Sequence, residues 1–120
     1  MPGRVKFIEH KDKKILFIDF SNCDEKQVLE VIEEARPVVK GQPEKSVLTL
    51  TDVTGTKYNS EVVQALKEYT KENKPYVKAG AVVGLNRIKK MVYNAVMEFS
   101  GRTLHAVDSI EKAKDWLAGQ

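Results

Sequence analysis

Cysteine is almost absent from this 120-residue chain, which contains only Cys23. A single cysteine cannot form a disulfide within the chain, and this usage suits a reducing compartment. The first fourteen residues reach several charges before any long apolar segment forms, so we expect no export signal. No apolar run approaches the roughly 18 residues that a membrane helix needs. We therefore expect a cytoplasmic protein without a transmembrane segment.

An excess of charge of one sign is also lacking, because 20 basic residues face 17 acidic ones and leave a net charge of +3. Lysine and arginine gather only in two short groups, at 11–14 and 87–90, which suit a solvated turn and a solvated helix face. A nucleic-acid-binding domain more often concentrates its cations on one face, among aromatic side chains. We therefore expect no nucleic-acid partner.

Residues that bind metals or act as nucleophiles are few. The two histidines, His10 and His105, are far apart and belong to no motif with metal-ligand spacing. Cys23 has no evident base beside it, although a thiol near a helix start can have a lowered pKa and label quickly. Residues 80–84, GAVVG, lack the spacing and the ending of phosphate-binding loops. We expect no metal, no cofactor and no enzymatic activity.

What the chain does contain is an alternation of strand and helix patterns, organised around residues 76–99. The apolar run at 77–83 is too short for a helix and too uniformly apolar for a half-exposed strand, so it predicts a strand buried on both faces. After Asn86 the apolar residues recur at helical spacing. The predicted inner face of this helix comprises Ile88, Met91, Val92, Ala95, Val96 and Phe99.

The N-terminal part of the chain predicts a hairpin and a helix. Two β-rich runs, 5–9 and 15–20, are separated by a short polar segment. The first run is expected at the edge of a sheet, where it could also pair with a second copy of the chain in a homodimer. Ser21 and Asp24 form a pattern like a capping box and predict where the first helix starts. Pro37 is expected to kink or end this helix.

The rest of the chain completes the predicted fold. Further strands are expected at 46–51 and 103–107, and further helices begin at Asn59 or Ser60 and at Asp108. The resulting order is β-β-α-β-α-β-α-β-α in a single domain of residues 1–120. This order predicts an α/β fold with an N-terminal β-hairpin, four helices and a mostly parallel five-stranded sheet.

Three stretches of the second half carry a resemblance to a known family: VKAGAVVG at 77–84, IKKM at 88–91, and FSGRT at 99–103 continuing to SIEKAKDWL at 109–117. Together with the element order, they resemble the STAS domain of anti-sigma-factor antagonists and, more closely, the SpoIIAA-like bacterial family. The resemblance implies a non-catalytic regulatory or protein-interaction module with a protein partner. Related CRAL-TRIO domains suggest an alternative, a binder of a small anionic or lipid-like ligand.

The same resemblance implies one modification site. STAS antagonists are typically switched by phosphorylation of a serine at the start of the second helix, in a motif like Asp-Ser-Ser-Gly. Residues 58–61 here read YNSE, so Ser60 is the corresponding residue, although the preceding acidic residue and the glycine are missing. A phosphate at a helix N-terminus is electrostatically favoured, and helix capping alone also explains a serine there.

Small polar residues follow the carboxyl ends of the predicted parallel strands, where ligands of α/β sheets bind. The predicted rim for a ligand or partner comprises Asp52, Thr54, Asn59, Asn86 and Arg87. An anion could dock at the helix start marked by Asn86, with help from Arg87. Turn and capping chemistry would also explain each of these residue types. A ligand binder further requires an apolar pocket of several hundred cubic ångströms.

Overall fold

The computed structural model describes residues 4–120 and contains five strands and four helices in the predicted order. In chain order these are β1 (Val5–His10), β2 (Lys13–Asp19), α1 (Glu25–Lys40), β3 (Val47–Asp52), α2 (Ser60–Asn73), β4 (Val77–Val83), α3 (Arg87–Ser100), β5 (His105–Val107) and α4 (Ile110–Ala118). The predicted α/β class is confirmed. Within residues 4–120, no helix is long and apolar enough to cross a membrane.

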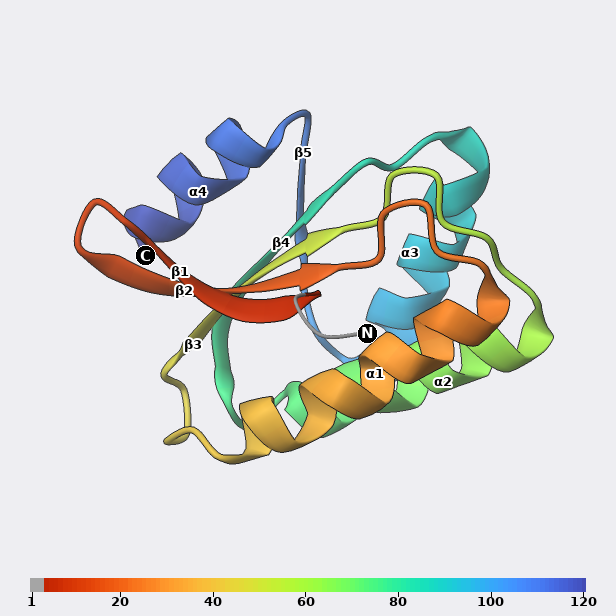
Figure 1. Cartoon of the computed structure of the whole chain (residues 1–120), viewed down its shortest axis with the longest axis horizontal. Helices are drawn as coiled ribbons and strands as arrows, with labels where there is room; N and C mark the ends of the chain where they lie inside the picture. The colour runs from red at the N-terminus through yellow and green to blue at the C-terminus, as the bar shows by residue number, and fades with distance from the viewer. Residues whose placement is uncertain (1–3) are drawn as a thin grey trace.

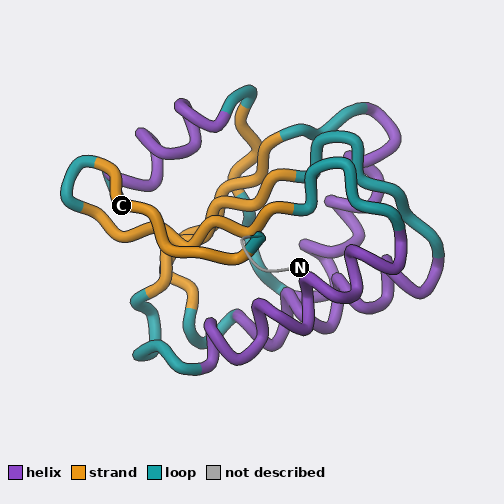
Figure 2. The backbone as a smooth tube through the Cα atoms, in the orientation of Figure 1, coloured by secondary structure: helices purple, strands orange, loops and turns teal. Residues whose placement is uncertain are grey.

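The strands form one sheet in the order β1-β2-β3-β4-β5, with β1 antiparallel and the others parallel. Helices α1, α2 and α3 cover one face of this sheet and α4 covers the other (Figures 1 and 2). Lys11 and Asp12, both with positive φ, make the two-residue turn of the hairpin, which suits the twist of its strands. β1 is an edge strand, as predicted, and its pairing in a homodimer stays a prediction.

Side chains alternate between the two faces of the sheet and form one apolar cluster on each. Leu16 and Ile18 of β2 pack toward α1 and its neighbours, whereas Ile15 packs in the cluster that includes α4. On the central strand β3, Leu48 and Leu50 belong to the α4 cluster. The opposite face of β3 therefore carries the threonines of the sequence VLTLTD, and these lie under α2 and α3.

The start and the end of α1 both differ from the prediction. The Asp24 carboxylate caps the helix by accepting from the Gln27 backbone N–H, and the Gln27 side-chain oxygen accepts from the Asp24 backbone N–H. These two residues form the capping box, and Ser21 takes no part in it. Pro37 does not end the helix, which continues to Lys40. The proline lies in the last turn, where its missing N–H removes a single backbone bond, and Val39 beyond it remains fully buried.

Asparagine and serine caps begin the other helices. Asn59 caps α2 and Asn86 caps α3, as the sequence predicts, each accepting from a backbone N–H three residues on. Ser109, and not Asp108, caps α4. The Asp108 carboxylate instead accepts from Lys112 at 3.3 Å, which leaves the capping position to the residue that follows it.

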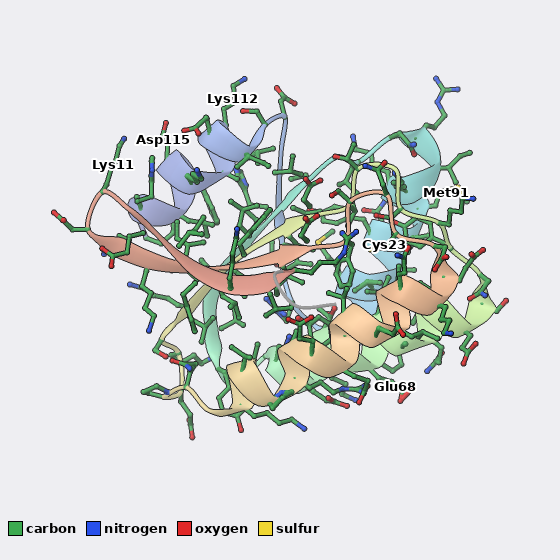
Figure 3. All side chains as sticks on the ribbon, viewed as in Figure 1. Lys11, Cys23, Glu68, Met91, Lys112 and Asp115 are labelled. Carbon is green, nitrogen blue, oxygen red and sulfur yellow. The ribbon has the colours of Figure 1, made fainter. Side chains whose placement is uncertain are left out.

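Helix α3 is rotated relative to the prediction, and its two largest aliphatic side chains face outward. Ile88 and Met91 are each 72% exposed, and Figure 3 shows Met91 pointing away from the body of the protein. Lys89 is buried instead, at 7% exposed, whereas Val96 is buried as predicted, at 6%. The Tyr93 hydroxyl donates to the backbone carbonyl of residue 104 and holds the helix in this orientation. The predicted inner face is therefore wrong for Ile88, Met91 and also Phe99, which is 44% exposed.

Replacing Ile88 and Met91 together with glutamine is expected to change the free energy of unfolding by no more than about 0.5 kcal/mol, because both side chains are already in water. Val96→Ala on the same helix is the matched control and should cost about 2 kcal/mol. Chemical denaturation of the three proteins measures both values. A loss of several kcal/mol in the double variant would show that the helix turns its apolar stripe inward after all.

Candidate functional site

The polar residues of the predicted rim lie at the carboxyl end of the sheet, where four of the five serve a turn or a cap. The Asp52 carboxylate accepts from the backbone N–H of Thr54 at 3.0 Å and from its hydroxyl at 2.7 Å. The side chains of Asn59 and Asn86 accept from backbone N–H groups at 2.8 Å. Arg87 is exposed. None of these five residues lines the cavity described below.

Ser60 is the first residue of α2 and is exposed. Because Asn59 supplies the cap, the Ser60 hydroxyl is not needed for capping. Glu61 follows it in the first turn of the helix. Phosphorylation of Ser60 stays a prediction, and its position at a helix N-terminus is the one that the resemblance requires.

Cys23 lies between the end of β2 and the start of α1 and is fully buried (Figure 3). Burial raises the pKa of its thiol, with smaller contributions from Asp19 and Asp24, while Arg4 acts in the opposite direction. The lowered pKa considered for Cys23 is therefore wrong. Labelling at neutral pH is expected to be at least about tenfold slower than in a model peptide, because the reagent must wait for local opening. A rate equal to the peptide's would contradict this burial.

A cavity of about 80 Å³ lies between the sheet and helices α2 and α3. Thr49 and Thr51 of β3 contribute to its sheet side. Leu66 of α2 and Val92 and Val96 of α3 are among its apolar walls. The cavity is therefore mainly apolar, and α3, whose outer face carries Ile88 and Met91, forms one of its walls.

Two polar groups at the α2 side of the cavity have no hydrogen-bond partner among residues 4–120. They are the hydroxyl of Tyr69 and the side-chain oxygen of Asn73, both buried. Burial raises the pKa of Tyr69 to about 12. The Asn73 side chain opposes this rise because it is within hydrogen-bonding reach of the hydroxyl, although the two groups do not meet the distance and angle of a hydrogen bond, and the guanidinium groups of Arg102 and Arg36 oppose it as well. An unpaired buried polar group costs about 1–3 kcal/mol, so this pair is an unusual feature of a folded core.

Arg102, two residues after α3, also lines the cavity. One guanidinium nitrogen, Nη1, donates to the Thr70 carbonyl at 3.3 Å. The other, Nη2, lies 3.1 Å from the point that a Cβ on Gly80 would occupy, so glycine at this place in β4 makes room for it. Burial lowers the pKa of Arg102, and Tyr69 opposes this shift. Within the described chain, no carboxylate forms an ion pair with Arg102.

Lys89 lines the same cavity from the first turn of α3. Its side chain is buried, and across residues 4–120 its ammonium group joins no ion pair. The backbone of Lys89 lies about 17 Å along the helix from Ser100, the last residue of α3, and Arg102 follows two residues later. The cavity thus has a cationic residue at each end and no acidic side chain among its lining residues.

Searches against protein-family profiles and against characterised proteins find no match for this chain. Among solved structures, it is similar to an uncharacterised protein of the DUF3478 family from Shewanella loihica PV-4, whose crystal structure is described as SpoIIAA-like. The TM-score is 0.72 over 94% of this chain and 91% of the other, at 12% sequence identity. This chain has a SpoIIAA-like fold. At this identity the likeness shows the fold alone, and it confirms the resemblance inferred from the sequence.

The sequence prediction placed Val92 and Val96 on an inner helix face, but it did not predict the cavity of this SpoIIAA-like domain or the polar groups that line it. One signal was available: Thr49 and Thr51 occupy one face of a strand whose other face is leucine, in the middle of the sheet. A row of threonines under two helices indicates a core that is not filled with apolar side chains. Tyr69 and Asn73 gave no comparable signal, because both also occur on ordinary half-buried helix faces.

The two histidines lie on the α4 side of the domain. His10 contacts Asp115 at 2.7 Å, and the ring of His105 stacks on Trp116 at 4.2 Å between centroids. Figure 3 shows Lys11 and Asp115 close together where the hairpin meets α4. Within residues 4–120, no group of three or more His, Cys, Asp or Glu side chains could hold a metal ion.

The contacts of Asp115 predict a pH effect on stability. Hydrogen bonds from His10 and then Lys11 lower the pKa of its carboxyl below the ordinary value of 3.8. A carboxyl group whose pKa is lower in the folded state than in the unfolded state stabilises the protein at pH values above its unfolded pKa. This contribution disappears as the pH falls through the folded-state pKa. The melting temperatures of wild type and Asp115→Asn should therefore differ at pH 6 and converge near pH 3. An Asp108→Asn control, at an exposed i,i+4 pair, should show a smaller difference.

Proposed function

We propose that this SpoIIAA-like domain is a non-catalytic binding domain that takes a small, mainly apolar molecule into the cavity between β3, α2 and α3. The observation that carries the proposal is the combination of an apolar cavity with two unpartnered polar groups, on Tyr69 and Asn73. A core selected only for stability would place apolar side chains at such positions, because unpaired buried polar groups are costly. A ligand that supplies the missing partners would offset that cost.

The size of the cavity limits the ligand. Its volume of about 80 Å³ exceeds what one water molecule needs, roughly 10–15 Å³, but is smaller than the several hundred cubic ångströms expected for a ligand binder. The cavity therefore does not meet the size predicted for a ligand binder. We infer a ligand with few non-hydrogen atoms, or a longer one that displaces part of α3.

The proposal that the domain is not an enzyme follows from the groups around the cavity. In the described chain these are hydroxyls, an amide and two cationic side chains, without a carboxylate, imidazole or thiol. General acid–base and nucleophilic catalysis most often use an imidazole, a carboxylate or a thiol, although lysine and tyrosine can also serve. We propose that the lining groups bind a molecule through hydrogen bonds and positive charge and do not transform it.

Native mass spectrometry of the protein purified from its own cells tests the proposal. We expect a species heavier than the polypeptide, whose excess mass disappears under denaturing conditions. Val96→Phe, which adds a ring to the cavity wall, should lose this species, whereas Val63→Phe on the half-buried side of α2 should retain it. The polypeptide mass alone in wild type, combined with no effect of small organic acids or alcohols on its melting temperature, would contradict the proposal.

A second function, that of a regulatory or protein-interaction module, is favoured by the outer face of α3. Ile88 and Met91 are exposed there beside Arg87 and Lys90, and adjacent large aliphatic side chains in water commonly mark an interaction site. These two apolar and two basic residues suit a protein partner whose surface combines apolar and acidic groups. The patch covers the cavity, so a ligand that shifts α3 would also change the patch.

Site-specific photocrosslinking in cells tests the interaction function. A photoreactive amino acid at position 88 or 91 should give the same single crosslinked product. The product should disappear when Arg87 and Lys90 are changed to glutamate, and a probe at the exposed Gln64 of α2 should not give it. Identical products from position 64 would show that the α3 surface is not a specific site.

A further inference from the structure

We propose that the end of the cavity beside α2 is a carboxylate site, in which Arg102, Tyr69 and Asn73 bind the head group of a small monocarboxylic acid. The inference rests on the proposed ligand-binding function and adds the chemistry and the orientation of the ligand. It follows from two buried polar groups of α2, on Tyr69 and Asn73, that have no hydrogen-bond partner in the described protein, and from the half-buried guanidinium of Arg102, which uses one nitrogen for Thr70.

The three groups lie at one place. Arg102 reaches back under α2, since its Nη1 contacts the carbonyl of Thr70, the residue after Tyr69. Tyr69 and Asn73 are four residues apart on α2 and so share one face of the helix. Arg102 and Tyr69 are near enough for each to affect the pKa of the other. A guanidinium, a phenol hydroxyl and an amide therefore surround the same volume.

The positions of the Arg102 nitrogens leave donors for a ligand. A guanidinium carries five N–H groups, and the side chain uses one nitrogen for Thr70. Nη2 lies over Gly80, where the strand has no side chain to cover it. A planar fork of N–H donors matches a carboxylate in a bidentate pair. The Tyr69 hydroxyl and the Asn73 amide group, whose oxygen and nitrogen can exchange places by a rotation, add further donors.

The charge of the site favours a carboxylate over a phosphate. Arg102 is the cation that lines this end of the cavity, because Lys89 lies at the start of α3. Arg36 also acts on Tyr69, but it is not among the lining residues, and its charge is balanced by ion pairs with Glu33 and Glu72. One guanidinium balances one negative charge, whereas a phosphate monoester carries about 1.5–2 at neutral pH and would leave charge unpaired in an apolar surrounding. The apolar part of the ligand then runs along Leu66, Val92 and Val96.

Chemical-shift titration of the ¹⁵N-labelled full chain tests the site, with sodium hexanoate as probe and 1-hexanol as its uncharged match. We expect hexanoate to bind at least tenfold more tightly than hexanol and to shift the side-chain Nε–H signal of Arg102. Arg102→Met should weaken hexanoate at least tenfold and leave hexanol within twofold. Arg87→Met, at an exposed arginine on the same side of the domain, should leave both unchanged.

The outcomes separate this inference from the proposed function. If hexanol binds as well as hexanoate, and Arg102→Met affects neither, the cavity binds apolar molecules and the carboxylate site is wrong. If neither probe binds, both proposals fail. The comparison of acid with alcohol in the wild-type protein keeps the test valid if Arg102→Met does not fold. Shortening the acid from hexanoate to butyrate should weaken binding roughly fourfold per methylene group, and an unchanged affinity would contradict a tail in the cavity.

Discussion

Replacing Gly84 with alanine is expected to lower the free energy of unfolding by about 3 kcal/mol. Gly84 joins β4 to the cap of α3 with φ of +95°, a conformation that residues with a side chain rarely adopt. A Cβ there would lie 2.6 Å from the backbone nitrogen of Thr54 and 2.3 Å from its hydroxyl oxygen. Because Thr54 is held by Asp52, relief of the clash must move the loop or the start of α3.

Equilibrium denaturation with urea measures this loss, and Gly119→Ala is its control. Gly119 has φ of −86°, and the nearest atom to its added Cβ would be at 3.5 Å, an ordinary contact. The control should therefore lie within about 0.5 kcal/mol of wild type. Equal stability of the two alanine variants would show that the turn before α3 is not as tightly packed as the structure has it.

Tyr69→Phe combined with Lys89→Met is expected to raise the free energy of unfolding by about 2–3 kcal/mol. The first change removes a buried hydroxyl that has no partner in residues 4–120, and the second replaces a lysine that is 7% exposed and forms no ion pair there by an apolar side chain of similar length. Both side chains would keep their packing while the cost of burying polar groups falls. The same double variant should no longer bind the ligand, because the two polar groups whose removal stabilises the protein are also groups that line the binding cavity.

Two nearby residues provide matched controls for this gain in stability. Tyr93→Phe should cost about 1 kcal/mol, because the Tyr93 hydroxyl donates to the Leu104 carbonyl. Lys90→Met, at the exposed neighbour of Lys89, should change stability by less than about 0.5 kcal/mol. If Tyr69→Phe destabilises the protein as much as Tyr93→Phe does, the Tyr69 hydroxyl has a partner within the protein, and the cavity holds no unmet polar group.

The order of elements was predictable because it depends on local patterns. The uniformly apolar stretch Val77–Val83 can only be a strand that is buried on both faces, and it is. Asn59 and Asn86 mark helix starts through the same side-chain contact in the structure as in the prediction. The parallel sheet and the SpoIIAA-like fold follow from the alternation of such strands and helices.

The rotation of α3 was not predictable from local patterns. Its apolar residues form a stripe, and the sequence alone favours turning that stripe inward. The structure keeps Val96 inside but buries Lys89 and exposes Ile88 and Met91. This orientation is fixed by contacts outside the helix, such as the bond from Tyr93 to Leu104. Departures of this kind from local preference are concentrated at functional sites.

The candidate site escaped prediction for a related reason. The rim of polar residues after the strands was expected to bind, but asparagines and aspartates also serve turns and caps, and those roles occupy Asp52, Asn59 and Asn86 here. The cavity instead depends on residues that α2 and the segment after α3 bring together, above all Tyr69 and Arg102. Their proximity arises from the packing of helices and leaves no trace in spacing along the chain.

Intermolecular nuclear Overhauser effects between hexanoate and the methyl groups of the protein test the central claim, that the cavity under α3 is the binding site. We predict contacts from the hexanoate chain to the methyl groups of Leu66 and Val96, which line the cavity, and none to the exposed Ile88 on the outer face of the same helix. Contacts to Ile88 without contacts to Val96 would place the ligand on the surface and contradict the account.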